Sequence, residues 1–220
     1  MIYPDRLQKL ADAVGILKTQ VLNMENNNDW YIAIVTPNTE KECVKKVKKL
    51  VGVEDMDEIY NAGNKVNAYV PTQRELHEWP SIKKRKWIER VLCPCYLFIQ
   101  CTEKERYDLA CRAKFIIRFL TDRARVDENG FRGFARIPHS QMENFMRMIG
   151  DAKNPITIDT SQLHKGTKVR VKTGHMAGLE GYILREPNGS VNLAIYIDYL
   201  GCAKMEFPIE DLDIVEVQDR

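Results

Sequence analysis

The cysteines and histidines are the residues that could bind a metal or act as nucleophiles, but their spacing argues against both roles. The clustered cysteines lack the paired C-x₂-C spacing of structural zinc sites: Cys93, Cys95, Cys101 and Cys111. The histidines are dispersed, with no recognisable nucleophile arrangement around them: His77, His139, His164 and His175. No Walker or GxGxxG phosphate loop is present. We therefore expect no metal, no cofactor and no enzymatic activity.

A basic run with an aromatic residue at its end is the second chemical feature. It consists of Lys83, Lys84, Arg85, Lys86 and Trp87. Residues 83–136 hold 14 Lys and Arg against 7 Asp and Glu, a balance that suits contact with phosphate. Two interpretations stay open. The run is either a solvated loop or a nucleic-acid contact in which phosphates are neutralised and a base stacks on Trp87.

Composition places the chain among ordinary soluble globular proteins. It has 220 residues, of which 44% are hydrophobic and 29% charged, with a net charge of +2. Residues 1–150 carry +5, from 25 basic and 20 acidic residues, and residues 151–220 carry −3, from 8 and 11. The sequence shows no apolar run long enough to span a bilayer and no signal-peptide core. A cytoplasmic protein with reduced cysteines is the expectation.

Hydrophobic spacing predicts a helix followed by a mixed region. Apolar residues in 4–23 recur at steps of three and four, as in an amphipathic helix that packs on its own domain or meets a partner. Strands are expected in four runs: 30–36, 67–72, 91–101 and a buried one at 116–121. Capping boxes predict three helix starts: Thr39, Thr102 and Ser140. This order indicates an α+β sheet covered by helices, close to the ferredoxin-like arrangement.

The last third of the chain changes character. Residues 150–161 contain few large apolar residues and predict a flexible linker. Five short β-rich runs follow, typical of a small closed barrel or sandwich, which we expect to be folded already in the free protein and not tethered to the rest. The sequence thus divides into four parts: a helical extension at 1–29, an α+β domain at 30–149, a linker at 150–161 and a barrel at 162–220.

Several motifs resemble a known family. Gly166 to Val171 and Gly174 to Ile183 resemble the KOW motif, in which Gly174, Gly178 and Gly181 are expected to adopt positive φ. Upstream segments resemble the NGN domain, in the same order: Trp30-Tyr31, Tyr69-Val70-Pro71, Pro94-Cys95-Tyr96-Leu97-Phe98 and the Phe119 strand. NGN followed by KOW is the architecture of the NusG family of transcription elongation factors. The resemblance implies a ferredoxin-like NGN domain and a small SH3-like, five-stranded KOW barrel.

Three departures from the housekeeping pattern make the chain similar to specialised paralogues of the RfaH or UpxY type. Cys95 replaces the usual Gly before the Tyr of the Pro-x-Tyr strand. Gly174-His175-Met176 replaces Gly-Pro-Phe, and an extension precedes Trp30. The resemblance implies a cytoplasmic, monomeric, non-enzymatic factor that binds RNA polymerase and suppresses pausing or termination, on a long operon such as one for surface polysaccharide.

The resemblance also assigns residues by position. Ile34, Tyr96 and Phe98 are expected to line an apolar hollow that receives the clamp helices of the polymerase. The basic run 83–87 falls in the family's variable hairpin, near DNA of the elongation complex. The KOW loop comprises Gly174, His175, Met176 and Gly178. A ribosomal or termination-factor protein is expected to bind to it. Two alternatives remain: an RNA-binding or ribosome-associated KOW protein, and the housekeeping NusG itself.

Overall fold

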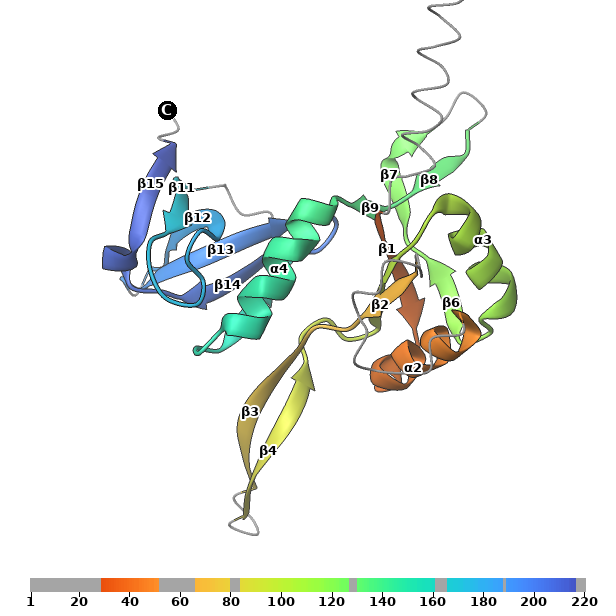
Figure 1. The fold of residues 1–220 in the computed structure, drawn as a ribbon, viewed down its shortest axis with the longest axis horizontal. Coiled ribbons are helices and arrows are strands. Elements are labelled where there is room, and N and C mark those ends of the chain that lie inside the picture. The colour runs from red at the N-terminus through yellow and green to blue at the C-terminus, as the bar shows by residue number, and fades with distance from the viewer. Residues whose placement is uncertain are drawn as a thin grey trace, which may run out of the picture.

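The computed structural model describes six stretches of the chain: 29–51, 66–79, 84–126, 130–160, 166–187 and 189–216. The helix expected at 4–23 and Lys83 of the basic run lie outside them. Figure 1 shows the two larger sheets apart from one another, with helix α4 (His139–Asp151) between them. No helix in the described stretches is long and apolar enough to cross a membrane.

The N-terminal sheet has its four main strands in the order β2-β5-β1-β6. Their bounds are β1 (Trp30–Val35), β2 (Asn67–Tyr69), β5 (Tyr96–Gln100) and β6 (Ile116–Phe119), and the short β9 (Arg136–Ile137) also pairs with β1. All of these pairings are antiparallel. Two helices cover one face: α2 (Glu40–Val51) and α3 (Glu103–Arg112). The element order predicted for residues 30–149 is therefore present, together with additional strands.

Alternation along the strands creates two cores. On one face of the sheet, the odd-numbered residues of β1 and β5 pack with α2 and α3. They are Tyr31, Ala33, Val35, Leu97 and Ile99. The opposite face presents Trp30, Ile32 and Phe98 to a second cluster, which contains the apolar side of α4. Both faces are therefore covered along most of their length.

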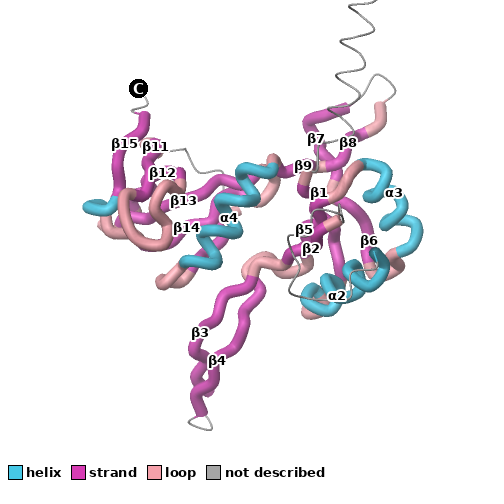
Figure 2. Tube along the Cα trace, viewed as in Figure 1, coloured by secondary structure: helices cyan, strands magenta, loops and turns pink. Residues whose placement is uncertain are grey.

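Two hairpins extend from this body. In Figures 1 and 2, β3 (Thr72–Trp79) and β4 (Lys84–Val91) form a two-stranded ribbon that projects away from both sheets. A shorter hairpin consists of β7 (Thr121–Val126) and β8 (Arg132–Phe134). The basic run, for which a solvated loop was one interpretation, thus lies largely on a strand.

The C-terminal sheet has six antiparallel strands in the order β10-β14-β13-β12-β11-β15. Its elements are β10 (Ile156–Asp159), β11 (Lys168–Val171), β12 (Glu180–Arg185), β13 (Val191–Ile197), β14 (Gly201–Glu206), the 3₁₀ helix η1 (Ile209–Asp211) and β15 (Leu212–Glu216). The five predicted runs correspond to β11 to β15. The sixth strand, β10, lies inside the segment that was expected to be a linker.

The flexible linker predicted at 150–161 is therefore wrong for residues 150–151 and 156–159, which belong to a helix and a strand. Helix α4 continues to Asp151, and β10 pairs with β14 from Ile156 to Asp159. The boundary at residue 162 also excludes a strand of the C-terminal sheet. The physical reason is that Ile156 and Ile158 alternate with polar residues, which is sufficient for a short edge strand whose apolar side packs inward.

The C-terminal sheet is also held against the rest of the chain, contrary to the expected untethered barrel. Helix α4 packs along β13. The Tyr199 hydroxyl donates a hydrogen bond to buried Asp122 of β7 at 2.9 Å. The Asp198 amide donates to the side chain of Gln141 on α4, also at 2.9 Å. Polar contacts thus fix the turn between β13 and β14 to both β7 and α4.

Candidate protein interface

The residues predicted to contact polymerase belong to cross-strand rows on one face of the N-terminal sheet. Phe98 pairs with Ile32, and Tyr96 pairs with Ile34. Paired residues in neighbouring strands share a face, with Cβ atoms roughly 5 Å apart. The structure therefore brings Ile34, Tyr96 and Phe98 together on one face, as the alternation of the strands predicts.

Helix α4 covers the first of these rows. The Phe98 ring lies 6.5 Å from the Phe145 ring at an interplanar angle of 74°, an edge-to-face contact, and Phe98 is 0% exposed. At the start of α4, Trp30 donates its indole N–H to His139 Nδ1 at 3.3 Å. Phe98 is consequently a core residue as long as α4 stays in place.

The Ile34–Tyr96 row lies one step further along the strands and is only half-buried. Ile34 also pairs with Arg118 on β6, so a third side chain extends the row across the sheet. The register shifts next to this pair, which leaves Ile117 as an extra residue on β6, 63% exposed. The buried strand predicted at 116–121 is therefore wrong at Ile117 and Arg118, which are both exposed.

A strained turn positions Tyr96. Cys95 has φ of +69°, a left-handed conformation that favours glycine. Its amide donates to Glu40 Oε1 at 2.8 Å, and its carbonyl accepts from the Val35 amide at 2.9 Å. The buried Glu40 carboxylate at the start of α2 thus holds the turn that begins β5. The preceding Cys93 is inert, because burial raises the pKa of its thiol to about 12.

Helix α3 is fixed to β1 by a half-buried charge cluster. Arg106 lies 3.5 Å from the Phe134 ring centroid and forms a hydrogen-bonded ion pair with Glu103. Glu103 also accepts the Tyr31 hydroxyl at 2.9 Å. Burial pushes the pKa of Glu103 up, but the hydrogen bonds from Arg106 and Tyr31 outweigh it and hold that pKa below its ordinary value.

The projecting hairpin carries an exposed apolar pair among charges. Trp87 on β4 pairs with Leu76 on β3, and the two are 61% and 45% exposed. Three glutamates form ion pairs with nearby cations: Glu78 with Arg85, Glu75 with Arg90 and Glu89 with Lys41. Within the described residues, Lys86 forms no ion pair. The phosphate-binding capacity predicted from the basic run is thus partly used inside the protein.

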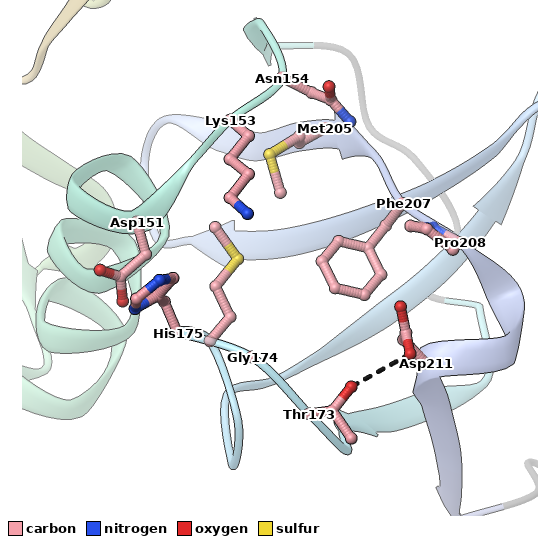
Figure 3. A pocket seen from close by; sticks show the side chains of 11 residues that line it. Asp151, Lys153, Asn154, Thr173, Gly174, His175, Met205, Phe207, Pro208 and Asp211 are labelled. Carbon is pink, nitrogen blue, oxygen red and sulfur yellow. Dashed lines mark hydrogen bonds between the residues drawn. The ribbon is translucent and has the colours of Figure 1, made fainter.

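The predicted KOW loop borders a pocket of about 320 Å³ beside the end of α4 (Figure 3). Met176, Met205 and Phe207 give it an apolar lining. In Figure 3, Lys153 extends into it from the loop after α4. Met176 is buried, whereas His175 is exposed.

The prediction of positive φ at the three KOW-motif glycines is confirmed at two of them. Gly174 and Gly178 have positive φ as predicted. Gly181 does not; a Cβ there would lie 2.8 Å from the Ala194 carbonyl oxygen, so close packing is what excludes a side chain.

Within the described residues no group of three or more His, Cys, Asp or Glu side chains is arranged to hold a metal ion. Three features are exposed or partly exposed: the Ile34–Tyr96–Arg118 row, the hairpin and the loop beside the pocket.

The chain has recognisable relatives. Residues 28–166, more than half of the sequence, match the family described as "Transcription termination factor nusG". A Thermotoga maritima NusG structure, described by its domain interaction, aligns with 86% of this chain and 97% of its own at 16% identity and a TM-score of 0.42. The MjSpt4:Spt5 complex in conformation B aligns with 87% and 99% at 11% identity and a TM-score of 0.28.

No curated protein sequence shows a significant match. With both TM-scores below 0.5, assignment rests on the family match over residues 28–166. That match covers the N-terminal sheet, the hairpins and α4, and it agrees with the resemblance seen in the sequence motifs. The chain belongs to the NusG family of transcription factors.

Proposed function

We propose that the protein is a transcription elongation and antitermination factor that binds RNA polymerase through its N-terminal sheet. Residues 30–149 act as the NGN domain, and the C-terminal sheet acts as the KOW domain. The observation that carries the proposal is the Ile34–Tyr96 row, because it is the apolar part of its sheet face that α4 leaves half-exposed. Side chains of this kind are suitable anchors for the clamp helices.

The proposed mechanism is differential binding. A factor that bridges the polymerase cleft and binds the elongating state more tightly than the paused state shifts the population toward elongation. No chemical step is needed. The departures at Cys95 and at Gly174-His175-Met176 support a specialised paralogue of the RfaH or UpxY type that acts on a long operon, such as one for surface polysaccharide.

The hairpin is proposed to contact DNA of the elongation complex. Trp87 is accessible for stacking, and Lys86 offers a cation that no described residue pairs. Lys83 and Lys84 belong to the same run. Since Arg85 is engaged with Glu78, the ribbon contributes fewer phosphate contacts than its sequence suggests.

The loop beside the pocket is proposed to receive a ribosomal or termination-factor protein. Exposed His175, Gly174 and buried Met176 line the pocket from this loop, and Gly174 and Gly178 both have the positive φ that shapes the loop. Asp151 and Asp211 line the same pocket, and the region after residue 150 is acidic overall. Negative charge repels nucleic acid, so a protein partner is the better match.

The test is retention on purified elongation complexes. We expect the full chain to bind elongating polymerase, and Tyr96→Ala to weaken binding by ~1–3 kcal/mol, the range for an interface anchor. Tyr107→Ala is the matched control, since Tyr107 is an exposed tyrosine on α3, on the other side of the sheet. Retention on ribosomes but not on polymerase would favour the alternative of a ribosome-associated KOW protein.

The hairpin contact is tested by salt dependence. Replacing Lys83, Lys84, Arg85 and Lys86 with Ser should flatten the slope of log affinity against log salt on DNA-containing complexes, because fewer counterions are released. Equal slopes for the parent and the variant would show that the run does not contact phosphate.

A further inference from the structure

The edge of the polymerase-binding row carries a positive charge that the proposed function leaves unassigned. Arg118 lies on β6, which is the edge strand of the N-terminal sheet, and pairs directly with Ile34 of β1. Ile34 in turn pairs with Tyr96 of β5. Three adjacent strands thus present tyrosine, isoleucine and arginine side by side, with exposed Ile117 next to the arginine.

Nothing in the described part of the chain satisfies the Arg118 side chain. It is exposed, and within those residues it forms no hydrogen bond or ion pair. Other arginines of the same region are engaged: Arg106 with Glu103, and Arg136 with Asp29 and Glu103. Arg118 therefore differs from them in having its planar set of N–H donors free for an external acceptor.

The residues around Arg118 indicate which kind of hydrogen-bond acceptor its guanidinium binds. Ile34, Tyr96 and Ile117 make an apolar surface, which gains from burial against another apolar surface and gains nothing from a phosphate backbone. An arginine at the border of such a surface is a common interface anchor, and a carboxylate is the acceptor that its guanidinium binds in two parallel hydrogen bonds.

From this juxtaposition we propose that Arg118 and Ile117 extend the polymerase-binding row and select a partner helix that carries a carboxylate beside its apolar contact residues. The inference rests on the proposed function and adds the chemistry of the partner to it. Arg118 forms an ion pair with that carboxylate, while Ile117, displaced outward by the bulge, packs beside it. Tyr96 and Ile34 anchor the other end of the same contact.

The test uses core RNA polymerase without nucleic acid, titrated with the full chain at low salt. Arg118→Glu should weaken binding at least tenfold, Arg118→Gln by a smaller factor and Ile117→Ser several-fold. The matched control is Arg132→Glu on the exposed strand β8, which should change affinity less than twofold. Added salt should reduce the difference between the Arg118→Glu and Arg132→Glu variants.

The outcomes distinguish a failure of the Arg118 contact from a failure of polymerase binding itself. If Tyr96→Ala weakens binding but Arg118→Glu behaves like Arg132→Glu, the row binds polymerase and the inference is wrong. If Arg118→Glu acts only when DNA is present, Arg118 serves a phosphate and the inference is again overturned. Failure of the parent protein to bind polymerase removes both. Arg118→Gln, which is neutral, guards against an effect of the introduced negative charge on folding.

Discussion

Truncating Phe98 should damage folding, whereas truncating Tyr96 should damage binding. The two residues are alternate positions of β5 on one face, but α4 covers only Phe98. Replacing a fully buried Phe by Ala costs ~3–5 kcal/mol, of which ~0.5–1.5 kcal/mol is the edge-to-face contact with Phe145. For a domain of this size that corresponds to a fall in Tm of roughly 6–20 °C.

Tyr96→Ala, at a half-buried position, should cost about 1–2 kcal/mol of stability, half or less of the value for Phe98. Thermal and urea unfolding followed by circular dichroism measure both changes, beside polymerase binding of the folded fraction. Phe98→Leu is the control that keeps most of the buried volume. If Phe98→Ala left Tm within a degree or two and abolished polymerase binding, Phe98 would be a contact residue and α4 would not cover it in solution.

Three further outcomes follow from particular contacts. Cys95→Gly should stabilise the fold by up to ~1 kcal/mol in urea unfolding. Relief of the left-handed φ is worth about 1–2 kcal/mol, which exceeds the cost of about 0.4–1 kcal/mol from the greater entropy of the unfolded chain. A destabilised variant would show that the packing of the Cys95 side chain contributes more than the strain costs. The pKa of Glu103 in the folded protein lies below its ordinary 4.5, so Glu103 stabilises the fold above that pH, and this contribution is lost as pH falls through the folded pKa. Glu103→Gln should therefore flatten the acid side of a curve of unfolding free energy against pH. Parallel curves for parent and variant would show that the Arg106–Glu103–Tyr31 contacts do not stabilise the fold. Tyr199→Phe should cost ~1–2 kcal/mol and increase hydrogen exchange in the turn after β13, because buried Asp122 loses a donor; unchanged exchange would mean that this contact does not hold the turn.

Local sequence patterns predicted helices and strands correctly where the residues of a segment favour only one type of secondary structure. The five C-terminal runs are short, are rich in residues that favour strands and are separated by Gly, Pro, Asn and Asp, and all five are strands. Thr102 caps α3 as predicted, with Glu105 returning the hydrogen bond to its amide. The helix start at Thr39 is also confirmed, since α2 begins at Glu40, but there the Thr39 hydroxyl donates to the Thr36 carbonyl. Helix α4 begins before Ser140, after Pro138, and Glu42 forms an ion pair with Lys46.

The errors concern packing, which the spacing of one segment cannot reveal. Helical spacing predicts a stripe of Met142, Phe145, Met146 and Ile149, whereas the buried residues of α4 are Met142, Phe145 and Met148, inside a cluster shared by both sheets. The same limit explains Phe98, since alternation assigns a face and does not say what covers it. β10 was missed because four residues with two isoleucines are a weak strand signal without their partner β14.

Helix α4 determines which part of the predicted interface is available. Its buried side packs on the row of Ile32 and Phe98, and it also packs along β13 of the C-terminal sheet. Ile117 and Arg118 are exposed although that sheet packs against α4, so the C-terminal sheet does not cover them. The row that we propose for polymerase thus needs no release of the C-terminal sheet, whereas any use of Phe98 would require α4 to move. Because a fully buried aromatic contact opposes that movement, binding through the uncovered row is the lower-energy route.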